Sequence, residues 1–166
     1  MKISTKVLYL LFFTVFFSCE RDDLCPEDAQ ITPQLVIDFF DINNPSELLA
    51  PTNLLIIEEG TENSFAPSGT TIFVPLRTNV DQTRFLFVLN STNEENDLTN
   101  PPNTDLIVLD YNRTNDFISE ACGFRVTFSG LQEQTDAQND GFWIENIEIV
   151  NPLIENENEA HIRIFH

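Results

Sequence analysis

Three cysteines offer the most specific chemistry in this sequence. Cys19 follows an apolar run and Ser18, a setting in which the thiol can be thioether-linked to diacylglycerol after cleavage, with palmitate as the acyl group. Cys25 and Cys122 are then left as a pair, which predicts a disulfide in an oxidising compartment. Two free thiols of a redox site are the alternative, but the C-x-x-C spacing typical of such sites is missing.

The segment from Asp136 to Gly141 resembles the first half of a calcium loop. Hard cations take several carboxylate and carbonyl oxygens from one tight turn, and Asp136 and Asp140 supply two carboxylates. The bidentate glutamate of an EF-hand is missing, because Ile147 stands at the twelfth position. A turn between two strands explains the same residues. Asp136 and Asp140 are therefore weak metal candidates, and we expect no cofactor.

The sequence lacks the motifs of common hydrolases. It has no H-E-x-x-H zinc motif, no G-x-S-x-G nucleophile elbow and no glycine-rich phosphate loop. His161 and His166 stand at odd spacing in one predicted strand, so they point to opposite faces and do not jointly chelate a metal. A carboxylate pair such as Glu58 with Glu59 has no specificity among 27 acidic residues. We therefore expect no enzymatic activity.

Phe142 and Trp143 are the candidates for a binding platform. Exposed aromatic rings stack well on sugar rings. A buried tryptophan in a sandwich core is the commoner arrangement, and both interpretations remain open at this point.

The elements that position these residues begin after an N-terminal signal. Lys2 and Lys6 precede an apolar run of about ten residues and a small residue, which is the pattern of a cleaved secretory signal and is too short for a membrane-spanning helix. We therefore predict a lipoprotein signal peptide over residues 1–18, a lipidated acidic tether over 19–33 and a β-sandwich domain over 34–166.

The overall charge excludes several classes of partner. Eight basic residues against 27 acidic ones give a net charge of −19, and both lysines lie in the predicted signal peptide. A body this negative repels phosphate backbones and anionic headgroups, which argues against nucleic-acid binding. The 15 phenylalanines and many aliphatic residues nevertheless indicate a folded chain.

Short β-branched and aromatic runs separated by turn residues predict an all-β fold. We expect about eight strands, at 34–41, 53–59, 70–77, 83–90, 104–112, 122–129, 142–150 and 159–166. Several alternate in polarity, and no crossover helices are evident, so we predict an antiparallel two-sheet β-sandwich of the Ig-like or prealbumin-like kind, with a small barrel as the alternative. The polar loop 91–104 and the edge of the terminal strand are the candidate contact surfaces.

Several segments together resemble a family of small Bacteroidetes (flavobacterial) lipoproteins of unknown function. They are Cys19–Cys25, Thr32–Asp41, Ala121–Phe124, Trp143–Ile144, Ile147–Val150 and Glu159–Phe165. The resemblance implies an outer-membrane location, and the acids after Cys19 resemble a surface-export signal that Arg21 interrupts. We expect display on the cell surface rather than on the periplasmic face.

These observations give two functional hypotheses. The first is an uncharacterised, non-enzymatic accessory or interaction subunit of an envelope complex, held in the membrane through Cys19 and partnered by an outer-membrane β-barrel or lipoprotein. The second is a glycan- or calcium-binding surface lipoprotein.

Overall fold

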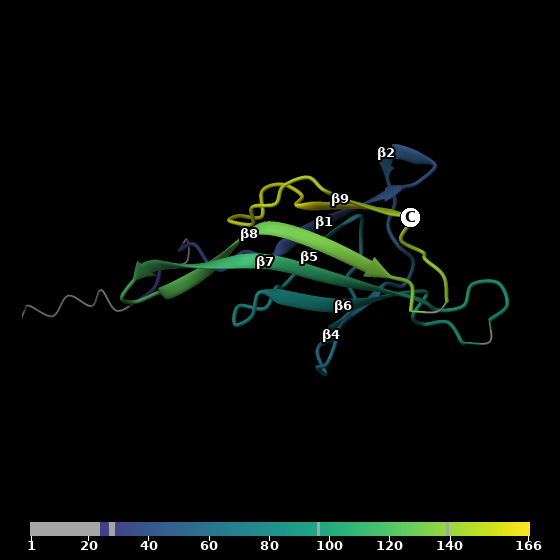
Figure 1. Cartoon of the computed structure of the whole chain (residues 1–166), viewed down its shortest axis with the longest axis horizontal. Coiled ribbons are helices and arrows are strands. Elements are labelled where there is room, and N and C mark those ends of the chain that lie inside the picture. Colours follow the sequence, from purple (N-terminus) through teal and green to yellow (C-terminus); the bar gives the residue numbers. More distant parts are fainter. Residues whose placement is uncertain (1–23, 27–28, 96, 139) are drawn as a thin grey trace, which may run out of the picture. The chain divides into compact units, whose positions relative to one another are not determined.

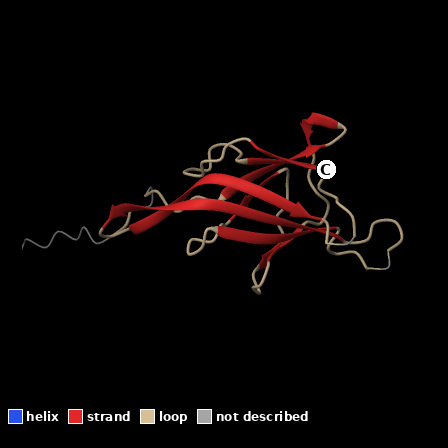
Figure 2. Ribbon diagram, in the orientation of Figure 1, coloured by secondary structure: helices blue, strands red, loops and turns tan. Residues whose placement is uncertain are grey.

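The computed structural model describes residues 24–26, 29–95, 97–138 and 140–166. These residues form ten strands in two sheets, and the described part contains no helix (Figure 2). The two-sheet β-sandwich predicted from the sequence is confirmed, with ten strands in place of about eight. The strands are β1 (Leu35–Asp41), β2 (Asn44–Leu48), β3 (Leu55–Glu58), β4 (Ser64–Phe65), β5 (Thr71–Val74), β6 (Gln82–Leu89), β7 (Asn103–Ser119), β8 (Gly123–Asp136), β9 (Asn146–Ile149) and β10 (Ile162–Phe165) (Figure 1).

The two sheets have five strands each. In the first sheet the order is β2, β1, β10, β9, and β5 also pairs with β1. The second sheet has the order β4, β3, β6, β7, β8. Along its length β1 therefore pairs with β5 through residues 35–38 and with β2 at residues 40 and 41.

The pairing of β1 with β10 is parallel. Ile37 lies opposite Ile162 and Phe39 opposite Ile164, whereas the other pairs with a defined register are antiparallel. The first sheet is therefore mixed. The expectation that the terminal strand forms an exposed edge is wrong, because β10 lies between β1 and β9.

Apolar side chains from both sheets form one core. Leu35, Ile37 and Phe39 point inward from β1, at 0–1% exposure, as period-two alternation predicts. The second sheet contributes residues from β3, β6, β7 and β8, and the segments that flank β9 complete the cluster. Its other members include Ile56, Phe85, Phe87, Ile107, Leu109, Tyr111, Phe128, Trp143, Ile144, Ile154, Ile162 and Ile164.

The alternation expected in β8 holds for only part of the strand. Phe128 is buried and Val126 packs against the core, as predicted. Phe124, expected on the same face, is 68% exposed, and Thr127 of the opposite face is buried. Phe124 belongs to a different compact unit from Val126 and Phe128.

The chain divides into two compact units. Of the described residues, 24–26, 29–30 and 117–124 belong to one unit, and those within 31–116 and 125–166 belong to the other. The core described above belongs to the second unit. In the described residues no helix is long and apolar enough to cross a membrane.

Candidate functional site

An open cleft of about 230 Å³ lies beside the start of β9. Glu133 and Thr135 of β8 line it, and the remaining lining residues are Phe142, Ile144, Glu145, Asn146 and Ile147. In the described chain β8 and β9 are the last strands of their respective sheets, so the cleft lies where both sheets end. The Phe142 side chain is 53% exposed there. The cleft therefore combines two carboxylates with an aromatic ring.

Asp105 of β7 positions the chain that lines this cleft. It is fully buried, and its Oδ2 accepts hydrogen bonds from the backbone N–H of Trp143 at 3.0 Å and of Ile144 at 2.8 Å. Its Oδ1 has no hydrogen-bond partner among the described residues. Burial raises the pKa of the Asp105 carboxyl, the negative charges of Asp140 and Asp136 raise it further, and the two N–H donors oppose that rise.

The predicted calcium candidates form a turn. Asp136 Oδ1 accepts hydrogen bonds from the backbone and side-chain nitrogens of Gln138, both at 2.9 Å, and Asp140 Oδ2 accepts one from the N–H of Thr104 at 2.9 Å. Gly141 adopts a φ of +87°, a left-handed conformation that favours glycine. Within the described ranges no three His, Cys, Asp or Glu side chains are grouped to hold a metal ion. Among the described residues, Asp136 and Asp140 therefore have no third carboxylate, imidazole or thiol beside them.

Trp143 belongs to the core and does not form a stacking platform. Its side chain is 7% exposed, and its Nε1–H donates a hydrogen bond to the carbonyl of Phe87 at 3.0 Å. Of the two aromatic residues proposed from the sequence, Phe142 alone presents its ring to solvent.

Glu58 and Glu59 do not act as a carboxylate pair, because each faces its own arginine. Glu58 Oε1 lies 3.1 Å from Arg77 Nε, and Glu59 forms an ion pair with Arg84. Glu58 also accepts a hydrogen bond from the Asn63 amide at 2.9 Å. Both carboxylates therefore serve contacts within the fold.

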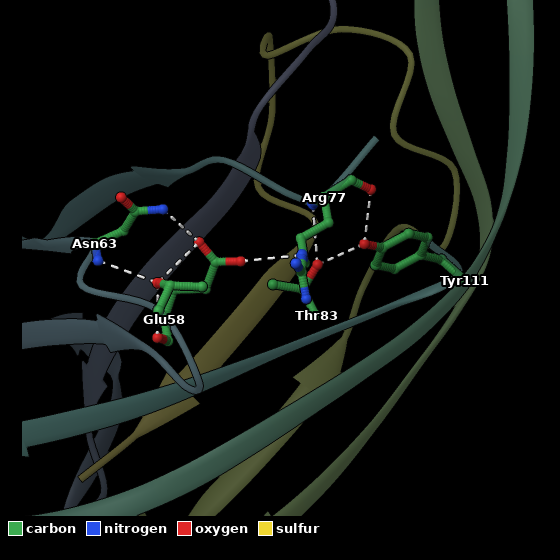
Figure 3. Close-up of polar contacts among 6 residues, drawn as sticks. Glu58, Asn63, Arg77, Thr83 and Tyr111 are labelled. Atoms are coloured by element: carbon green, nitrogen blue, oxygen red, sulfur yellow. Dashed lines mark hydrogen bonds and ion pairs between the residues drawn. The ribbon is translucent and has the colours of Figure 1, made fainter. Parts of the chain in front are cut away.

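Arg77, which lies in the connection between β5 and β6, also takes part in a polar network with residues of the second sheet (Figure 3). The Arg77 N–H donates to Thr83 Oγ1 at 3.0 Å, Thr83 Oγ1 lies 2.5 Å from the Tyr111 hydroxyl, and that hydroxyl donates to the Arg77 carbonyl at 3.0 Å. Burial raises the pKa of Tyr111, which keeps the phenol protonated as a donor. Each of these polar groups is hydrogen-bonded to another group of the network, so the network stabilises the fold.

His161, which the sequence analysis considered only as a metal ligand, is a further buried polar residue. It is 1% exposed, and its Nδ1 accepts a hydrogen bond from the N–H of Val36 at 2.9 Å. Burial lowers the pKa of His161, opposed by a hydrogen bond to the Asn156 backbone and by the charges of Glu159 and Glu157. The ring is therefore neutral and helps to join β1 to the chain entering β10.

This neutral ring makes stability depend on pH. The unfolded imidazole takes up a proton near pH 6.5 whereas the folded one resists it, so the unfolded state binds more protons as the pH falls. We expect the free energy of unfolding to decrease from about pH 7.5 to 5.5, by up to about 1.4 kcal/mol per pH unit. Urea denaturation at several pH values measures this.

His161→Asn, which keeps an acceptor near the Nδ1 position, should flatten the decrease in the free energy of unfolding, and the control His166→Asn should retain it. An unchanged slope in His161→Asn would contradict the assignment.

Two of the three cysteines lie in the described part of the chain. Cys19, with the predicted signal peptide 1–18 and the first residues of the tether, lies outside the described residues. Cys25 and Cys122 are joined by a disulfide, with an S–S distance of 2.04 Å and a Cα–Cα distance of 4.8 Å. The pair expected from the sequence is therefore bonded in the structure.

The polar loop expected at 91–104 ends earlier in the structure. β7 begins at Asn103, so the loop proper ends at residue 102. Short local bonds shape it, including Asn93 Nδ2 to the Asn100 carbonyl at 2.8 Å and the Thr99 hydroxyl to Asp97 at 2.7 Å. Thr104, whose N–H binds Asp140, belongs to the second sheet.

Together the fold and the cleft define a small acidic β-sandwich protein with a surface cleft where its two sheets end. A family model described as a family of unknown function (DUF6452) matches residues 53–166. The chain therefore belongs to the DUF6452 family. No curated protein and no solved structure matches it. The matched residues include β3 to β10 and leave out β1 and β2.

Proposed function

We propose that this protein is a lipid-anchored lipoprotein of the outer membrane that serves as a non-enzymatic accessory or interaction subunit of an envelope complex. The anchor follows from the sequence around Cys19, and the Cys25–Cys122 disulfide supports an oxidising compartment. Display on the cell surface is part of the proposal and follows from the acidic residues after Cys19.

The observation that carries the interaction role is the edge at β9. In the described chain β9 has a hydrogen-bonded neighbour on one side only, and the cleft with Phe142 lies beside it. Val150 and Leu153, which follow β9, are 41% and 43% exposed. A sheet edge next to exposed apolar side chains suits a partner that adds an extended segment. Glu145 and Glu148 give this edge a negative charge, which favours a partner segment with basic residues.

Affinity capture from native outer membranes tests this role. We expect the tagged lipoprotein to recover one near-stoichiometric β-barrel or lipoprotein, with crosslinks that map to β9 and the cleft. Phe142→Ser should reduce recovery at least about tenfold, as expected for a contact residue worth more than about 1.4 kcal/mol. Phe73→Ser is the matched control, because Phe73 on β5 is 45% exposed and does not line the cleft.

Three outcomes would overturn parts of this proposal. Capture of the protein alone would remove the accessory role. Equal recovery by Phe142→Ser and Phe73→Ser would remove the cleft from the interface, and crosslinks confined to 91–102 would move the interface to that loop. A deletion that tests the loop must stop before Asn103, since β7 begins there.

A glycan- or calcium-binding surface lipoprotein is the second candidate. The cleft favours it, because Phe142 is exposed beside the carboxylates of Glu133 and Glu145. A shift in melting temperature with one member of a glycan panel or with calcium, lost in Phe142→Ser or Glu133→Gln respectively, would support it. Unchanged melting temperatures across both series would exclude it.

A further inference from the structure

The tip of the β7–β8 hairpin presents a small apolar cluster to solvent. Phe117 and Phe124 are 58% and 68% exposed, and their rings meet edge to face with 5.3 Å between centroids. Leu24, in the same compact unit, is 83% exposed. Large apolar side chains exposed together indicate a surface that contacts another apolar phase.

The disulfide ties this tip to the chain that leaves the predicted anchor. Cys122 at the tip is bonded to Cys25, and the N–H of Cys122 donates to Ser119 Oγ at 3.0 Å. Cys25 follows Cys19 by six residues, and six residues span at most about 20 Å when fully extended. A lipid on Cys19 would therefore keep Cys25 within about 20 Å of the bilayer surface. The Cα of Cys122 lies 4.8 Å from that of Cys25, so the tip stays within about 25 Å of that surface.

We propose that the hairpin tip rests on the bilayer that holds the lipid anchor and inserts Phe117 and Phe124 into its interfacial layer. The inference rests on the proposed lipidation of Cys19. Aromatic side chains favour the membrane interface, where a ring is removed from water without crossing the hydrocarbon core. Glu120 at the tip and the acids of the tether exclude attraction to anionic headgroups as the driving force. The contact is apolar and takes zwitterionic lipid.

Fluorescence quenching by brominated lipid tests the contact. The lipidated full-length protein carrying Phe124→Trp is reconstituted into phosphatidylcholine vesicles with bromine near the headgroup end of the acyl chains. We expect emission from the introduced indole to fall at least about twofold relative to vesicles without bromine, as for a ring at the interface. Phe142→Trp is the matched control, because Phe142 is similarly exposed in the other unit. The native Trp143, which is buried, contributes the same background to both.

Mass spectrometry of the acyl group on Cys19 separates the two levels of the inference. An acylated protein whose Phe124→Trp emission is quenched no more than that of Phe142→Trp would overturn the membrane contact and leave the anchor standing. A protein without an acyl group that does not remain with the vesicles would overturn the anchor, and the membrane contact with it.

Discussion

Replacing Cys25 and Cys122 together by serine is expected to lower the free energy of unfolding by about 4–5 kcal/mol. The two cysteines are 97 residues apart in the sequence. A crosslink over a loop of that length restricts the unfolded chain strongly, and the chain-entropy model gives about 4.7 kcal/mol for 100 residues. Since the whole stability of a small domain is about 5–15 kcal/mol, the variant should be only marginally folded.

Chemical denaturation of the non-acylated chain beginning at residue 20 measures this difference. Wild type treated with dithiothreitol should lose the same free energy as the double serine variant, and it controls for the serine side chains. Equal midpoints for oxidised and reduced protein would show that the bond constrains the hairpin tip alone. Hydrogen exchange that increases only within 117–124 on reduction would lead to the same conclusion.

Asp105→Ala is expected to cost about 2–5 kcal/mol, because it leaves the buried N–H groups of Trp143 and Ile144 without an acceptor. Water cannot replace this acceptor, since Trp143 and Ile144 are only 7% and 4% exposed. Asp110→Ala is the matched control on the same strand. Asp110 binds Gln82 in an exposed contact at 2.7 Å, and its removal should cost less than about 1 kcal/mol. Thermal and urea unfolding measure both variants.

Asp105→Asn separates the hydrogen bonds from the charge. The amide oxygen can still accept both N–H groups, so this variant should lose less than Asp105→Ala. Because the pKa of Asp105 is raised on folding, wild type loses stability as the pH rises above about 4, the value of the unfolded carboxyl. Asp105→Asn should therefore gain stability relative to wild type as the pH rises above about 4. A difference in the free energy of unfolding between Asp105→Asn and wild type that does not change with pH would contradict the assignment of a buried carboxyl.

Polarity alternation located most of the strands because one face of each is buried. Leu35, Ile37 and Phe39 mark β1 in this way, and all three lie in the core. The same signal could not locate β2, whose residues are all exposed, or β4, which has only two residues. These strands depend on hydrogen bonding to a neighbour, which leaves no apolar pattern in the sequence.

The apolar pattern could not predict the full length of the β7–β8 hairpin either. Both strands extend past the predicted limits through polar residues that satisfy one another. Asp116 lies 3.4 Å from Arg125 Nε and accepts a hydrogen bond from the Thr127 hydroxyl at 3.3 Å. Such cross-strand polar pairs stabilise the pairing of two strands as apolar pairs do. In a sequence, however, a run of polar residues looks like a loop.

The candidate site was predictable only in fragments. Phe142 and the Asp136–Gly141 turn were identified from composition, whereas the cleft depends on where two sheets end and has no local signature. Asp105 did leave a signal, since it is a single carboxyl directly before the apolar run Leu106–Leu109. A charged residue beside such a run is either buried with hydrogen-bond partners or exposed at the end of the strand. Asp105 is buried and has two such partners, the N–H groups of Trp143 and Ile144.

The parallel pairing of β1 with β10 has a consequence for how the protein acquires its fold. The first sheet has at its centre two strands whose paired residues, such as Ile37 and Ile162, are more than a hundred positions apart. Until residues 162–165 have emerged, β1 lacks its neighbour on that side and β9 has no strand to join. A chain that emerges from its N-terminus must therefore wait for its last strand, and the apolar residues of β1 stay exposed until then. Chaperones that bind exposed apolar segments would be needed longest for this half of the sandwich.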